Sequence, residues 1–89
     1  MLEFDWDEEN VRHLARHGVT ISEAEYALEN PTLELDYQIV NEEERFVEVG
    51  ATARGRVLEL VTTFRGWKTR VVTAYDADPD IVEEYHQTR

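Results

Sequence analysis

Basic side chains in the second half of the chain are the residues whose type and spacing could do chemistry. Eight of the nine basic residues are arginines, and Lys68 is the only lysine. A guanidinium can meet two oxygens of one phosphate, so arginines on nearby strands could bind such an anion. Arg45 and Arg70 are the first candidates, supported by Arg65 and Lys68. The alternative is that these residues form surface ion pairs with some of the 20 acidic residues.

Aromatic side chains are the next candidates for contacts with a ligand. Trp67 stands in a predicted turn beside basic residues, where it could stack on a nucleic-acid base or contact a partner. Trp6 is expected in the core, where it would anchor the first helix against the sheet. Tyr75 and Tyr85 could flank one site if the last helix folds back over the end of the preceding strand. The alternative for both tyrosines is packing between helix and sheet, with their hydroxyls at the rim.

Two histidines share a helical face, because His13 and His17 are four residues apart. This spacing is compatible with two metal ligands, but no further His or Cys lies nearby in the sequence. A simpler interpretation places His17 at a helix C-terminus, where the dipole favours imidazolium, and leaves His13 partly exposed. Either histidine could also serve as a general base, because histidine titrates near neutral pH.

The composition is that of one globular domain over residues 1–89. Hydrophobic residues make up 42% of the chain, which suits a modest core rather than disorder. Cysteine is absent, so disulfides and thiolate metal sites are excluded. No apolar stretch approaches the length of a membrane span, and the first ten residues are acidic where a signal peptide is basic. We therefore expect a cytoplasmic protein with no membrane partner.

The net charge of −11 is the unusual property of this composition. Such a balance disfavours binding to a phosphate backbone at ordinary salt. The acidity could be a general surface trait of a protein from a high-salt or GC-rich background. It could equally mean that the protein has no nucleic-acid partner. The sequence leaves both explanations open.

The predicted elements give the order β-α-α-β-β-β-β-α. Residues 2–6 alternate like a short edge strand, and Asp7 can cap a helix that ends at His17-Gly18. A capping box at Thr20 opens a second helix that ends before Pro31. Strands are predicted over residues 32–37, 45–51, 57–64 and 69–75, and a last helix over 79–85 after a cap at Asp78. The prediction is an α+β fold, an antiparallel meander packed by helices.

Two segments of the chain resemble the BrnT-like toxins. WDEENVRHLARHGVTISEAEYALENP, from Trp6, is similar to the family's Trp-Asp helix, which ends in His-Gly-Val before a second helix containing Glu-Ala. ERFVEVGATARGRVLELVTTFRGWKTRVVTAY is similar to its arginine-led strand, its glycine-containing hairpin and its Arg-Val-Ile-(Ser/Thr)-Ala-Arg strand. The resemblance covers Phe4 to Tyr85.

This resemblance implies a RelE-like fold and a toxin that cuts RNA to inhibit translation. The reaction would need a base for the 2′-hydroxyl, an acid for the leaving 5′-oxygen and cations for the transition state, but no metal or other cofactor. It also implies a cognate small DNA-binding antitoxin that neutralises the toxin. Carried over by position, Arg45, Arg70 and Tyr85 would be the catalytic residues. The predicted RNA contacts are Arg65, Trp67, Lys68 and Tyr75.

Two departures from the family pattern support a second hypothesis. Tyr75 stands where the family has a strand-end arginine, and residues 79–85 contain no basic residue. The chain could then be a catalytically weakened or inactive relative that acts as a protein-binding module or a homo-oligomer. The toxin hypothesis predicts that Arg45, Arg70 and Tyr85 share one cleft.

Overall fold

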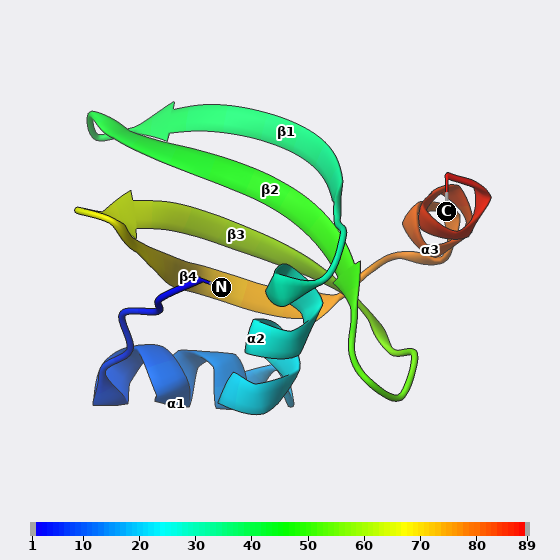
Figure 1. Ribbon diagram of the computed structural model, residues 1–89, viewed down its shortest axis with the longest axis horizontal. Coiled ribbons are helices and arrows are strands. Elements are labelled where there is room, and N and C mark those ends of the chain that lie inside the picture. Colours follow the sequence, from blue (N-terminus) through cyan, green and yellow to red (C-terminus); the bar gives the residue numbers. More distant parts are fainter. Residues whose placement is uncertain (1, 89) are drawn as a thin grey trace.

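The computed structural model describes residues 2–88 and shows the predicted α+β fold. This part of the chain contains three helices and a four-stranded antiparallel sheet with the strand order β1-β2-β3-β4 (Figure 1). The helices are α1 (Glu8–Arg16), α2 (Ile21–Glu29) and α3 (Pro79–Gln87). The strands are β1 (Leu33–Val40), β2 (Glu43–Ala51), β3 (Val57–Arg65) and β4 (Lys68–Asp76).

The strand predicted over residues 2–6 is not formed. Phe4 instead makes a single parallel bridge with Thr69 of β4. The alternation that suggested a strand has a different cause, because Phe4 and Trp6 both pack against the core beneath α1 and α2. The indole Nε1 of Trp6 also donates to Glu25 Oε2 at 2.8 Å, which ties this segment to α2. Trp6 thus packs against the core, as predicted, but it is only partly buried and its side-chain hydrogen bond is to α2 rather than to α1.

Local capping chemistry explains where α1 and α2 begin. The Asp7 side chain accepts a hydrogen bond from the Asn10 amide at 2.8 Å, as an N-cap does. Thr20 and Glu23 form the predicted capping box at the start of α2. Between the helices, Gly18 takes a φ of +70°, which only glycine adopts without strain. Both predicted helix starts are thus confirmed.

Tight turns connect the strands and set their register. Asn41 and Glu42 both have positive φ, which closes the β1–β2 hairpin in two residues, and both strands extend further than predicted. Gly66, with φ +65°, serves the β3–β4 hairpin. The β3–β4 pairing steps from Val61–Thr73 to Thr62–Val71, so Val72 is an extra, bulged residue in β4. It lies between Val71 and Thr73, the two β4 residues that α1 contacts through Asn10 and His13.

The two faces of the sheet carry separate apolar clusters. On one face, α1 and α2 cover a core that includes Leu58, Leu60 and Val71. Gly50 permits this contact, because a Cβ there would lie 2.7 Å from the carbonyl oxygen of Ala27 in α2. On the other face, α3 contributes to a smaller cluster of Val49, Val57 and Tyr85, with Leu33, Leu35, Ala51, Ala77, Ile81 and Val82 packed around it.

Helix α3 lies beyond one end of the sheet rather than across its middle (Figure 1). Asp78 is the N-cap residue and Pro79 the first helical residue, as predicted, although the Asp78 side chain makes no capping hydrogen bond. The apolar cluster of α3 reaches the part of β2 that contains Val49, at the end of the strand away from Arg45. Helix α3 therefore leaves uncovered the end of this sheet face that contains Arg45.

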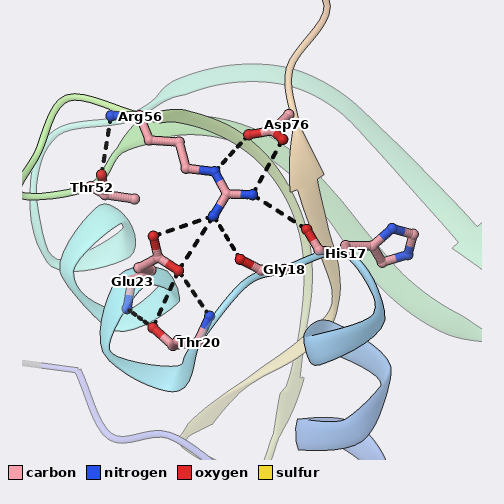
Figure 2. Close-up of polar contacts among 7 residues, drawn as sticks. All are labelled: His17, Gly18, Thr20, Glu23, Thr52, Arg56 and Asp76. Atoms are coloured by element: carbon pink, nitrogen blue, oxygen red, sulfur yellow. Dashed lines mark hydrogen bonds and ion pairs between the residues drawn. The ribbon is translucent and has the colours of Figure 1, made fainter.

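Arg56 ties the β2–β3 connection to the rest of the fold (Figure 2). Its guanidinium bonds both carboxylate oxygens of Asp76, at 2.6 and 3.2 Å, and forms an ion pair with Glu23 at 3.3 Å. It also donates to the carbonyls of Gly18 and His17. Asp76 in turn raises the pKa of Arg56, chiefly through its side-chain hydrogen bond. One side chain thus fastens the α1–α2 turn to the end of β4.

Candidate active site

A groove of about 300 Å³ opens between α1 and the end of the sheet face that α3 leaves uncovered. It contains contributions from four elements of the fold. The lining residues are Glu9, Asn10, His13 and Arg16 of α1, Glu43 and Arg45 of β2, Thr63 and Arg65 of β3, and Arg70 and Val72 of β4. Arginines from three strands and one helix therefore meet at this site.

Strand periodicity and register place the arginines together. Alternate residues of a strand point to the same face, so Arg65 lies on the face of Thr63 in β3. Thr63 pairs with Arg70 across the β3–β4 ladder. Thr63 Oγ1 also donates to the backbone carbonyl of Glu44, next to Arg45, at 2.6 Å. A threonine on the central strand thus stands between arginines of the two flanking strands.

Helix α1 is fixed against the edge of β4 by side-chain hydrogen bonds. Asn10, which is 5% exposed, donates from Nδ2 to the Val71 carbonyl at 2.5 Å. Its Oδ1 is buried and has no hydrogen-bond partner within residues 2–88. One turn further along, His13 Nε2 lies 3.1 Å from Thr73 Oγ1. These contacts hold the polar face of α1 over the groove.

Carboxylates occupy two of the groove arginines. Arg70, with a side chain 14% exposed, lies 2.9 Å from Asp7 Oδ2 and 4.0 Å from Asp5 Oδ2. The Asn10 amide and, more weakly, Arg70 lower the pKa of Asp7. Arg45 Nε lies 3.1 Å from Glu43 Oε1. A phosphate that binds here would have to share or replace these ion pairs.

Comparison with known proteins agrees with the resemblance in the sequence. The sequence model of a family described as "Ribonuclease toxin, BrnT, of type II toxin-antitoxin system" matches residues 6–80. The chain belongs to this family. A search among curated proteins finds no significant match. Because type II toxins are paired with an antitoxin, membership of the BrnT family implies an antitoxin partner.

The matched region contains six of the seven predicted site residues, and three of them share the groove. Arg45, Arg65 and Arg70 line it together. Lys68 pairs with Arg65 across the β3–β4 hairpin but lies outside the groove lining. Trp67 is 78% exposed at the tip of the same hairpin, where its Nε1 donates to Glu3. The basic hairpin therefore extends outward from the groove.

The two tyrosines lie apart from the groove lining. Tyr75 donates its hydroxyl to Glu59 Oε2, and this bond raises the tyrosine pKa to about 12. Tyr85 is 5% exposed and packs with Val49 and Val57 in the cluster beside α3. It also follows the family match, which ends at residue 80. The predicted cleft that would join Tyr85 to Arg45 and Arg70 is not the groove observed here.

Of the four α1 residues that line the groove, only His13 was a candidate from the sequence, as a general base; Glu9, Asn10 and Arg16 were not. The spacing of four and three residues places Glu9, His13 and Arg16 on one face of a helix. This polar stripe is visible in the sequence. That it faces the groove depends on the packing of α1 along the edge of β4, which no local sequence pattern predicts. Within residues 2–88, no group of three or more His, Cys, Asp or Glu side chains is placed to hold a metal ion.

The helices of the described region are all nine residues long. None of them is long and apolar enough to cross a membrane.

Proposed function

We propose that this chain is an endoribonuclease toxin whose groove binds the scissile phosphate of RNA and cleaves it without a metal ion. The observation that supports this most directly is the meeting of Arg45, Arg65 and Arg70, from three strands, in one groove. In a chain with a net charge of −11, such a gathering of cations is a local exception to the overall field. It suits an anionic ligand held at a defined point.

The groove arginines would act by stabilising charge rather than by moving protons. An arginine stays protonated in proteins, so Arg45 and Arg70 would offer fixed donors to the non-bridging phosphate oxygens. These oxygens gain negative charge as the 2′-oxygen attacks, so the donors bind the transition state more strongly than the substrate. Arg65, Lys68 and Trp67 would hold flanking nucleotides along the exposed hairpin, with Trp67 offering a ring for stacking.

Cleavage by this route yields a 2′,3′-cyclic phosphate and a 5′-hydroxyl, because the 2′-oxygen displaces the 5′-oxygen. Cutting cellular RNA in this way would inhibit translation. We further propose that the fold is RelE-like and that the antitoxin is a small DNA-binding protein. Catalytic participation of Tyr85 and an RNA contact by Tyr75 stay predictions from the resemblance.

A second candidate function rests on the ion pairs within the groove. Asp7 holds Arg70 and Glu43 holds Arg45, so the two central arginines already have anionic partners. An inactive relative that uses the domain to bind another protein, or a second copy of itself, would show this arrangement without any cleavage.

The experiment that separates the two functions is cleavage of a synthetic RNA oligonucleotide by the purified protein in EDTA. We expect cleavage with cyclic-phosphate ends, and a loss of about 10²-fold or more in Arg70→Ala. Arg54→Ala is the matched control, because it removes the same charge from an exposed turn outside the groove. Intact RNA with the wild-type protein, or equal rates for both variants, would exclude this active site.

A further inference from the structure

His13 is the one histidine that lines the groove within residues 2–88. It projects from the middle of α1, half-buried, toward the arginines supplied by the sheet. Its Nε2 lies 3.1 Å from Thr73 Oγ1, so β4 fixes the orientation of the ring. A threonine hydroxyl can donate to a neutral ring nitrogen and accept from a protonated one. The contact can therefore persist in both protonation states of His13.

A second histidine supports the ring from the next turn of α1. The ring of His17 meets that of His13 edge-on, with centroids 5.6 Å apart. The ring of Tyr75 also lies near that of His17, with centroids 6.0 Å apart. Thr73 and His17 thus position the His13 ring at the groove. Thr73 bonds Nε2 and leaves the other ring nitrogen, Nδ1, unbonded by this hydroxyl.

The other groups that line the groove suit proton transfer less well. Arginines do not lose their protons in proteins. The Glu43 carboxylate is bonded to Arg45, and the Glu9 side chain is exposed to solvent. Tyr75, with its pKa raised to about 12, holds its proton toward Glu59. Histidine is the side chain whose ordinary pKa lies nearest neutral pH.

We propose that His13 is the general base of the RNA cleavage assigned above to this groove, an inference that rests on that proposed function. The neutral imidazole takes the proton of the 2′-hydroxyl while the 2′-oxygen forms its bond to phosphorus. The bond from phosphorus to the 5′-oxygen breaks, and its electron pair leaves with that oxygen, which takes a proton from water. His13 returns its proton to the solvent. No oxidant or metal enters this balance.

The charged and titratable groups around His13 come from four elements. Glu9, Arg16 and His17 lie on α1 and Arg70 lies on β4, while Glu43 and Arg45 of β2 and Arg65 of β3 line the same groove. A general base acts only in its unprotonated form, so activity should rise with pH. A role limited to packing α1 on β4 would change stability without creating this dependence.

The test measures cleavage of a synthetic RNA oligonucleotide between pH 5 and 9 by the wild type and three variants. His13→Gln should lose about 10²-fold in kcat and should no longer show the rise with pH near neutrality. Thr73→Val should move the midpoint of the rise, because it removes the hydroxyl that bonds Nε2. His86→Gln, on the exposed side of α3, is the control and should cleave like the wild type.

A binding measurement keeps the proposal independent of folding losses. An oligonucleotide with a 2′-deoxy scissile position cannot be cut, and it should shift the ring resonances of His13 in the wild-type protein while binding His13→Gln with similar affinity. Wild-type cleavage with an unchanged rate and pH profile in His13→Gln overturns the role of His13 alone. Absence of cleavage by the wild type overturns the proposed function and this inference with it.

Discussion

Two arginine sites in this domain have opposite characters. One is the single residue Arg56, and the other is the groove that contains Arg45, Arg65 and Arg70. Arg56 is bonded by two carboxylates and two backbone carbonyls and joins three segments of the chain. In the groove, Arg70 is paired with Asp7 and Asp5, Arg45 has one carboxylate partner, and Arg65 makes no ion pair within residues 2–88. The fold itself satisfies the donors of Arg56. Arg45 and Arg65 keep donors available for a ligand.

A fold and a ligand use arginine donors differently. A guanidinium has five donor hydrogens, and a structural site uses most of them at fixed angles. Arg56 satisfies this description, and its two acidic partners respond with lowered pKa values. Arg45 and Arg65 do not satisfy it. Variants at the two sites should therefore affect stability and activity separately.

The largest expected effect is on activity at the groove. Arg45→Ala removes a donor that we propose stabilises the phosphorane-like transition state, so kcat should fall about 10²- to 10³-fold, as for other preorganised donors. Its free energy of unfolding should change by no more than about 0.5 kcal/mol, because the single pair with Glu43 lies near the surface. RNA cleavage and urea unfolding measure the two quantities. A stability loss as large as that of Arg56→Ala would mean that Arg45 supports the fold rather than a ligand.

The opposite pattern is expected at Arg56. Arg56→Ala should lower the free energy of unfolding by about 1–3 kcal/mol, because it leaves the Gly18 and His17 carbonyls and two carboxylates without their donor. Arg54→Ala, two residues earlier in the same exposed turn, is the matched control and should change it by less than about 0.5 kcal/mol. Urea unfolding at neutral pH compares them. Equal stabilities for the two variants would show that the Arg56 cluster does not support the fold.

Stability toward acid should follow from the same cluster. Arg56 lowers the pKa of Asp76 through its hydrogen bond, and the Thr20 amide, followed by Arg56, lowers that of Glu23. Because both folded-state pKa values lie below their unfolded values, the stabilisation is complete above those unfolded values and is lost as the pH falls through the folded ones. Unfolding between pH 7 and 2 should therefore be less acid-dependent in Arg56→Ala than in the wild type. Parallel pH curves would contradict this.

Sequence patterns predicted the elements well because capping and alternation act over a few residues. Asp7, the Thr20–Glu23 box and Asp78-Pro79 marked the helix starts that the structure shows. Other features depend on approaches between distant segments. The Arg56 contact with Gly18 joins residues 38 apart, and Asn10 meets Val71 across 61 residues. No local pattern encodes such contacts.

The same reasoning explains the outcome at the candidate site. The strand arginines were predicted together because they fall on nearby strands of one meander, and the groove contains three of them. Tyr85 was linked to them by resemblance alone, and its position depends on where α3 comes to rest. Leu2 to Trp6 alternated like a strand, yet the aromatic rings at positions 4 and 6 are used for core packing. Burial of every second side chain gives the same alternating sequence in a strand and in an irregular segment that packs on the core.

The smallest expected effect concerns the carboxylate that holds Arg70. Asp7→Asn keeps an effective N-cap for α1, since asparagine accepts the Asn10 amide equally well, but it removes the charge 2.9 Å from Arg70. Freed of that anion, Arg70 should bind a phosphate more readily. The affinity for a non-cleavable 2′-deoxy oligonucleotide should rise about two- to fivefold, the scale of an exposed ion pair.

Glu8→Gln provides the control for this variant, because it removes the same charge from the next residue, which faces Arg12 at 3.9 Å and lies outside the groove lining. Fluorescence anisotropy at a fixed salt concentration would compare the two, since both raise the net charge equally. A gain in Asp7→Asn beyond that of Glu8→Gln means that Asp7 competes with the ligand for Arg70. Equal gains would mean that Arg70 resembles Arg56, a residue already committed to the fold, and the groove would lose its central donor.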